Sequence, residues 1–244
     1  MIYYVISLLA ILLCGAIGGW ANSKVKRAYQ KYGAIGTRSH MTGYDTARRL
    51  LTANGATDIS LGRIGGNLTD HYHPTKKVVN LSEGVYGSTS VAAVAVAAHE
   101  VGHVMQNKKG YLFYKIRTAL VPITNFGGRL AVPLVLVGLL LDISVGFTQE
   151  YTLGYTLAMV GVALYGLSTL FTLVTLPVEL DASRRAKRML AEEGILSDDE
   201  IPHADKMLDA AAMTYLASLL TSAIFFLRFL LWVLMMFGGR RRRD

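Results

Sequence analysis

The chain has 244 residues, of which 52% are hydrophobic, and its formal net charge at pH 7 is +8. This composition is too apolar for an ordinary soluble domain, and a single cysteine, Cys14, excludes a disulfide framework. The positive charge lies beside apolar stretches rather than among aromatic residues. Anionic lipid is therefore the expected partner of the basic segments, and nucleic acid is not.

Four apolar stretches approach the roughly 20 residues that a helix needs to cross a hydrocarbon core about 30 Å thick. They are residues 1–21, 130–147, 152–178 and 210–237. The first stretch has no basic residues at its start and no small-residue cleavage site, so we expect it to stay as an N-terminal anchor. The sequence therefore predicts a multi-pass protein of the cell membrane.

The distribution of lysine and arginine predicts how these stretches are oriented. Residues 22–129 and 181–209 carry the positive charge and are expected in the cytoplasm, whereas residues 148–151 carry none and are expected outside. The last stretch stays open between a transmembrane and a re-entrant or interfacial helix. Arg228 within it costs about 2.5–3.5 kcal/mol at mid-membrane, and residues 240–243, all arginine, follow it.

Between the first two stretches the sequence predicts a small α+β unit. Residues 42–53 have helical spacing of apolar side chains. Three short strands are expected in an antiparallel meander, at residues 59–64, 68–72 and 78–81. An alanine-rich helix follows at residues 91–106, with Ser88 or Ser90 as its N-cap.

The strand at residues 68–72 comes before this helix and is a candidate edge for substrate binding. An extended peptide can pair with such an edge through its backbone, and Leu68, Thr69 and Asp70 would then contact it. A plain sheet strand without a substrate is an equally good interpretation.

The alanine-rich helix contains the sequence His99-Glu100-Val101-Gly102-His103. Because residues four apart lie on one face of a helix, His99 and His103 can bind the same small cation. Zinc is the expected ion, since it accepts imidazole ligands and lowers the pKa of a bound water to about 7. Glu100 is placed to take the proton of that water. This motif predicts a zinc hydrolase.

Two histidines leave a tetrahedral zinc site short of one protein ligand and a water. A third histidine six residues after the second is excluded, because Lys109 occupies that position. Glu179 is the strongest candidate for the third ligand, since it lies where an apolar stretch meets a basic helix. Asp181 is about 200° further round the helix, so we expect it either to orient a ligand histidine or to pair with Arg184 or Arg185.

Hydrolysis also needs a donor for the oxyanion of the tetrahedral transition state. The candidates near the predicted edge strand are His71, Tyr72 and His73. For each of them a structural role is the more frequent use of such a side chain.

Several segments in one order along the chain resemble the YugP-type family of bacterial membrane zinc metallopeptidases. They are Asp70-His71-Tyr72 and residues 78–83, 94–103, 119–122, 125–127 and 176–183. The resemblance implies zinc on His99 and His103, catalysis by Glu100 and a third ligand at Glu179. The family pattern has aspartate where this chain has His73, so the role of that position stays open.

The predicted fold class is an α-helical polytopic membrane protein with a small α+β zincin-like cytoplasmic unit, in which a short antiparallel sheet precedes the metal helix. The expected division is an anchor at 1–22, a metallopeptidase unit at 23–129, a transmembrane hairpin at 130–178, a cytoplasmic segment with the third ligand at 179–209, a transmembrane or re-entrant helix at 210–237 and a basic tail at 238–244.

The predicted function is a gluzincin-like zinc endopeptidase that cleaves peptides or proteins, membrane proteins included, on the cytoplasmic side. Two alternatives stay open. One is an inactive scaffold braced by zinc, in which a fourth protein ligand such as His71 closes the site. The other is a transport component built on Asp142 and Arg228. The oligomeric state is not predicted.

Overall fold

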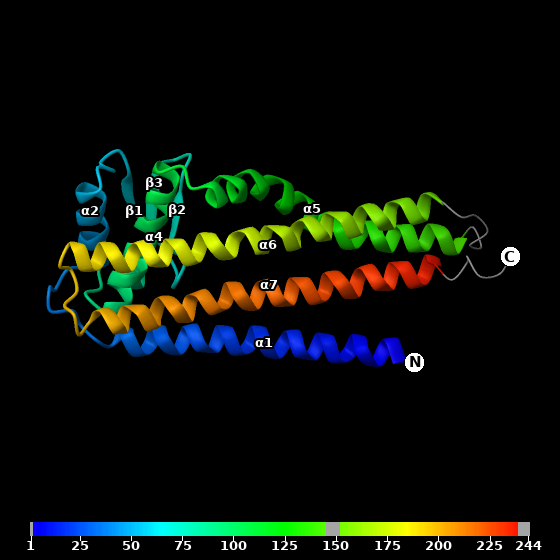
Figure 1. Cartoon of the computed structure of the whole chain (residues 1–244), viewed down its shortest axis with the longest axis horizontal. Helices are drawn as coiled ribbons and strands as arrows, with labels where there is room; N and C mark the ends of the chain where they lie inside the picture. The colour runs from blue at the N-terminus through cyan, green and yellow to red at the C-terminus, as the bar shows by residue number, and fades with distance from the viewer. Residues whose placement is uncertain (1, 145–151, 239–244) are drawn as a thin grey trace. The chain divides into compact units, whose positions relative to one another are not determined.

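The computed structural model describes residues 2–144 and 152–238 (Figure 1). Its elements are α1 (Ile2–Gly33), α2 (Gly43–Ala53), β1 (Ser60–Ile64), β2 (His71–His73), β3 (Val78–Ser82), α3 (Glu83–Tyr86), α4 (Val91–Lys108), α5 (Leu112–Ser144), α6 (Leu153–Glu192) and α7 (Ile201–Gly238). They form two compact units. We call Gly19–Lys115 with Leu176–Leu216 the sheet unit, and the described residues of Met1–Gly18, Ile116–Thr175 and Ala217–Asp244 the apolar unit.

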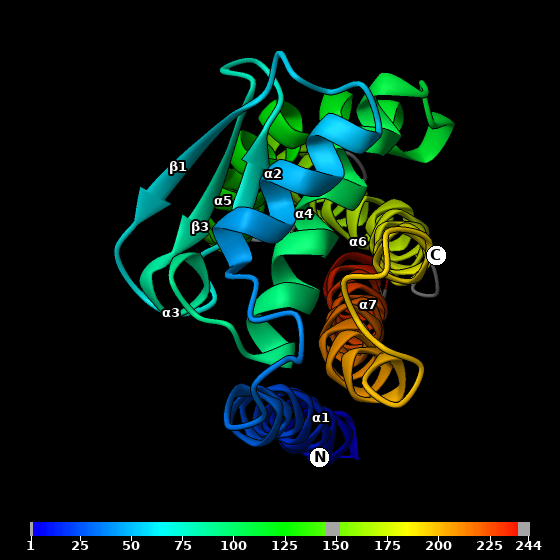
Figure 2. The same cartoon turned by 90° about the vertical axis from the view of Figure 1, so that its left-hand side faces the viewer.

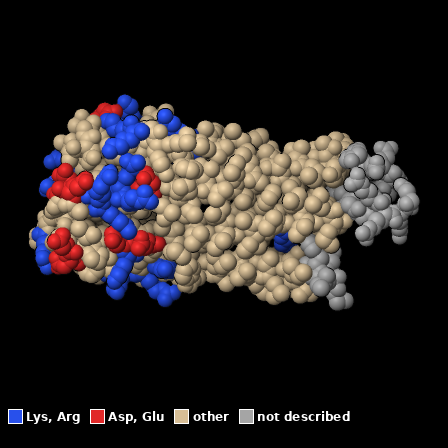
Figure 3. Space-filling view, in the orientation of Figure 1, with Lys and Arg blue, Asp and Glu red and all other residues tan. Residues whose placement is uncertain are grey.

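Four helices, α1, α5, α6 and α7, are long and apolar enough to cross a membrane. Figure 3 shows the charged side chains gathered toward one end of the visible face, and the rest of the described part of that face is almost wholly uncharged. The predicted mostly helical membrane fold is thereby confirmed. The expected outer connection at residues 148–151, the Asp142 side chain and the basic tail at 240–243 lie outside the described side chains.

The helix α5 begins at Leu112, well before the predicted apolar stretch at residue 130. Lys115, Arg117 and Arg129 interrupt the apolar pattern of its first half without ending the helix, which explains the difference. In the apolar unit α5 packs closely on α6 through small residues. A Cβ on Gly161 would lie 2.5 Å from the Ala131 carbonyl oxygen, so only glycine allows this approach.

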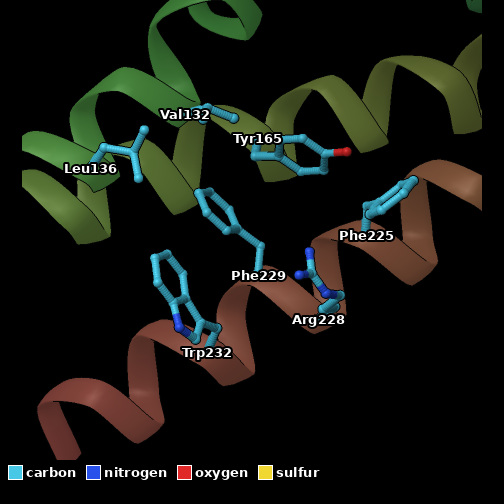
Figure 4. A pocket seen from close by; sticks show the side chains of 7 residues that line it. All are labelled: Val132, Leu136, Tyr165, Phe225, Arg228, Phe229 and Trp232. Carbon is cyan, nitrogen blue, oxygen red and sulfur yellow. The ribbon is translucent and has the colours of Figure 1, made fainter. Parts of the chain in front are cut away.

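The last apolar stretch is part of one continuous helix, α7, so the helix is not broken there. Arg228 lies in this helix and lines a pocket of about 390 Å³ in the apolar unit. Figure 4 shows its guanidinium among Tyr165, Phe225 and Phe229, side chains that come from α6 and α7.

The sheet has the order β1-β3-β2 and is mixed. β2 runs antiparallel to β3, as expected. The predicted antiparallel meander is wrong for β1, which pairs with β3 and runs parallel to it. The prediction treated neighbours in the chain as neighbours in the sheet. Instead the connection after β1 crosses over, and β1 and β2 flank β3.

The edge strand β2 is shorter than the predicted strand at residues 68–72, of which it contains only His71 and Tyr72. Leu68 lies in a turn with a φ of 55°, and Gly66 before it has a φ of 97°. These left-handed conformations end any strand pairing there. Leu68, Thr69 and Asp70 are therefore loop residues beside the edge, not part of it.

The core of the sheet unit forms around α4, with α2 packed on it and β1 and β3 beside them (Figure 2). Thr42 and Asp45 close a capping box at the start of α2. At the start of α4 the Ser90 hydroxyl accepts a hydrogen bond from the Ala93 N–H at 3.2 Å. The small side chains of α4 allow neighbours on every face, and fourteen of its eighteen residues are buried.

Candidate metal centre

The helix α4 comes very close to the last turns of α6 at Gly102. A Cβ on Gly102 would lie 2.5 Å from the Ala182 carbonyl oxygen, a distance that real Cβ atoms do not show. Glycine at this position therefore allows the two backbones to approach. The sequence analysis missed this role, although a glycine inside an otherwise alanine-rich helix is a signal of close packing.

The approach brings together His99 and His103 of α4 and Glu179 of α6. Glu179 Oε2 lies 3.1 Å from His99 Nε2 and 3.4 Å from His103 Nε2. The three ligand atoms lie within 4.8 Å of one another. Glu179 is only 1% exposed and His103 only 7%. The Glu179 carboxylate therefore has almost no contact with water. A bound cation between the two imidazole rings would balance this buried carboxylate.

These distances fit zinc. Zinc–ligand bonds of about 2.0–2.1 Å with tetrahedral angles place two ligand atoms about 3.3 Å apart. The two separations of 3.1 and 3.4 Å lie on either side of that value. The donor set, two imidazole nitrogens and one carboxylate, is also one that zinc accepts with a position left for water.

The second ring nitrogen of each histidine has its own partner. His99 Nδ1 lies 3.2 Å from the Ser183 hydroxyl of α6, and His103 Nδ1 lies 3.0 Å from Gln106 Oε1. Gln106 Oε1 can only accept, so His103 carries its proton on Nδ1. Its Nε2, on the side of Glu179, is then the ring nitrogen left to bind a metal.

Gln106 is fully buried and makes three hydrogen bonds. Its Nε2 donates to the Val178 carbonyl at 2.7 Å and to Asp181 Oδ2 at 2.9 Å. Because both partners only accept, the amide orientation is fixed and its oxygen must face His103. The sequence analysis missed Gln106, although a glutamine on the buried face of an apolar helix needs partners.

Asp181 combines the two roles weighed for it from the sequence. Its Oδ2 accepts a hydrogen bond from Arg185 Nε at 2.6 Å and one from Gln106. Asp181 therefore acts on His103 only through Gln106. The hydrogen bond from Arg185 holds the Asp181 carboxylate in the position where it accepts from Gln106.

Glu100 lies beside the three clustered side chains and is 7% exposed. Burial disfavours the carboxylate and raises the pKa of Glu100 to about 7, and the negative charges of Glu179 and Asp70 add to this. His99 and a hydrogen bond from the Tyr72 backbone N–H oppose the rise. A carboxyl group that titrates near neutral pH is suited to accept and return a proton.

Asp70 and Tyr72 fix the position of the edge strand beside Glu100. Asp70 accepts hydrogen bonds from the Ser82 N–H at 2.7 Å and from the Ser82 hydroxyl at 2.9 Å. The Tyr72 hydroxyl accepts one from Asn107 Nδ2 of α4 at 3.1 Å. These bonds hold β2 to β3 and to α4.

His71 and His73 have partners within the sheet and its turns. His71 Nδ1 lies 2.9 Å from the Thr69 carbonyl oxygen and its Nε2 lies 3.1 Å from Asn80 Nδ2. His73 Nδ1 accepts a hydrogen bond from the Lys76 N–H at 3.3 Å. Among the described residues neither histidine belongs to the group that could hold a metal ion.

A buried His-His-Glu group with an adjoining glutamate is a residue set that zinc metallopeptidases use, and the sequence comparisons point to the same class. The chain belongs to the family described as "Putative neutral zinc metallopeptidase", whose model matches residues 4–234. It is 40% identical over 221 residues to "Putative membrane protease YugP" of Bacillus subtilis (strain 168), which covers 91% of this chain and 92% of that protein. No solved structure matches the chain. The family resemblance seen in the sequence is confirmed.

Proposed function

We propose that this protein is a gluzincin-like zinc endopeptidase, with the metal held by His99, His103 and Glu179. The proposal rests on one observation, the convergence of these three ligand atoms within 4.8 Å beside a buried Glu100. Bound zinc would supply a Lewis acid for the scissile carbonyl and lower the pKa of the attacking water.

The side chains of this site then have distinct tasks. Glu100 takes the proton from the attacking water and passes it to the leaving amine. Gln106 holds His103 in the tautomer that leaves Nε2 for the metal, and the Ser183 hydroxyl orients the His99 ring through Nδ1. Tyr72 positions the Glu100 carboxylate through its backbone N–H.

The edge strand β2 supports the binding of an extended peptide. It is the outer strand next to β3, and its Tyr72 N–H faces the Glu100 carboxylate. A substrate backbone that pairs along this edge is held beside the catalytic carboxylate without regard to most of its side chains. Leu68, Thr69 and Asp70 adjoin the same edge.

We place the site on the cytoplasmic side, because the lysines and arginines gather in the segments of the sheet unit. Peptides and proteins are the substrate class, and segments of membrane proteins near the bilayer are included. Basic residues just after the first apolar stretch, Lys24, Lys26 and Arg27, are suited to contact anionic lipid.

The test compares the wild-type protein with Glu100→Gln and His103→Ala, purified in the same detergent. Zinc content is measured together with digestion of an unfolded test protein. We expect Glu100→Gln to keep its zinc and lose at least about 100-fold in hydrolysis, because the proton acceptor is gone. His103→Ala should lose both metal and activity.

A matched control is Glu83→Gln, which changes an exposed glutamate that forms only a surface ion pair with Arg63. It should keep both zinc and activity. A Glu100→Gln variant as active as the wild type would refute the proposed function, and equal digestion by all variants would point to a contaminating protease.

A further inference from the structure

A cleft of about 310 Å³ in the sheet unit has His99 and Glu100 in its wall. It is formed by α1, the loop before β2, α4 and the first turns of α7. The cleft is thus continuous with the proposed metal site. Its volume lies at the low end of the roughly 300–1,000 Å³ found for ligand pockets, which suits a side chain or two rather than a folded partner.

Most of the cleft wall away from the two catalytic residues is apolar. Val96 lies on α4 one turn before His99, and Leu208 and Ala211 face the cleft from α7. Val25 of α1 adds a further apolar surface. A wall of this kind stabilises an apolar group that leaves water. Its polar members are Asn22, Asp70, Thr214 and Tyr215, and the Asp70 carboxylate already accepts two hydrogen bonds from Ser82.

Leu68 is the most unusual member of the wall. It lies in the loop before β2, is 39% exposed, and has a φ of 55°, a conformation that leucine rarely adopts. An apolar side chain held in such a conformation at the rim of a cleft points to a contact made only when the cleft is filled. The same loop leads into the edge strand along which the substrate backbone is proposed to lie.

We propose that this cleft receives an apolar side chain of the substrate next to the scissile bond, so that the enzyme selects peptides with leucine, isoleucine, methionine or phenylalanine there. This inference rests on the proposed function and specifies its substrate class. The backbone is held by β2, and the cleft decides which bond of the extended peptide reaches Glu100.

The test maps the cleavage sites of a mixed peptide library by mass spectrometry, with wild-type protein in detergent. Peptides with a large apolar residue beside the scissile bond should be cleaved at least about tenfold faster than those with serine or aspartate. Ala211→Phe narrows the cleft from the α7 side. It should reduce cleavage beside large apolar residues about tenfold more than it reduces cleavage beside alanine.

The matched control is Ala53→Phe, the same substitution at an exposed position of α2 that does not line the cleft. It should leave the cleavage pattern unchanged. Leu68→Asn gives a second, independent change at the rim, because asparagine tolerates a positive φ. It should lower the preference for apolar residues with unchanged zinc content, and it decides the matter if Ala211→Phe does not fold.

The outcomes separate this inference from the proposed function. If the wild type cleaves no peptide faster than Glu100→Gln does, the proposed function is refuted, and the inference with it. If the wild type cleaves without an apolar preference, or if Leu68→Asn and a folded Ala211→Phe both keep the wild-type preference, the inference alone is overturned.

Discussion

Replacing Gln106 with leucine should weaken zinc binding, although Gln106 is not expected to touch the metal. Leucine has a similar volume, but it removes the acceptor for His103 Nδ1 and the donors to Val178 and Asp181. Asp181 keeps its hydrogen bond from Arg185, and the Val178 carbonyl keeps its place in the backbone hydrogen bonds of α6, so one buried group loses its partner, the His103 N–H.

The magnitude follows from that group. A buried polar group without a partner costs about 1–3 kcal/mol of folding stability, before the added apolar contact of leucine offsets a part. For the metal, loss of the group that orients a ligand histidine usually costs about 10- to 100-fold in affinity. We therefore expect Gln106→Leu to bind zinc about 10- to 100-fold more weakly than the wild type does.

The assay is a competition titration of purified protein against a zinc chelator, with thermal unfolding measured on the same samples. Gln30→Leu is the matched control, since it makes the same substitution at an exposed position of α1. Gln106→Glu keeps an acceptor for His103 but places a second carboxylate beside Asp181. Its thermal stability should therefore fall markedly, and its zinc affinity only slightly. Wild-type zinc affinity in Gln106→Leu would refute the link between Gln106 and the metal.

Two further predictions concern backbone approach and pH. Gly102→Ala should lower both zinc affinity and hydrolysis by tenfold or more, because its Cβ would push α6 and Glu179 away, whereas Gly87→Ala, with open space around it, should not. Glu200 is buried, yet hydrogen bonds from Ser197 and from the Arg38 N–H more than offset burial and lower its pKa. Its contribution, about 1 kcal/mol, is therefore present at neutral pH and lost as pH falls below about 4.3, and Glu200→Gln should flatten that part of a plot of Tm against pH. An unchanged Tm profile would contradict this reasoning.

Local features of the site could be predicted from the sequence, and long-range ones only in part. The pairing of His99 with His103 follows from helical periodicity, and the Ser90 cap from the residue types at a helix start. Glu179 was found because few carboxylates lie where an apolar stretch meets a basic one. The roles of Gln106 and Gly102 depend on which helix lies opposite, and a single sequence does not specify that.

The sheet shows the same limit. The three strands were placed to within a few residues, because alternation and turn residues are local signals. The order of the strands in the sheet was not predicted correctly, because β1 pairs with β3 after a crossover that local patterns do not encode. The early start of α5 was missed since charged residues hide a helix from an apolar window without breaking it.

The proposed metal ligands come from two parts of the chain, with His99 and Glu179 eighty positions apart. During synthesis the ribosome releases the histidine pair long before the carboxylate that completes their set. A nascent or truncated polypeptide therefore holds the proton acceptor and two imidazoles but no finished centre. If the proposed function holds, hydrolytic capacity arises only once the chain has been made beyond Glu179.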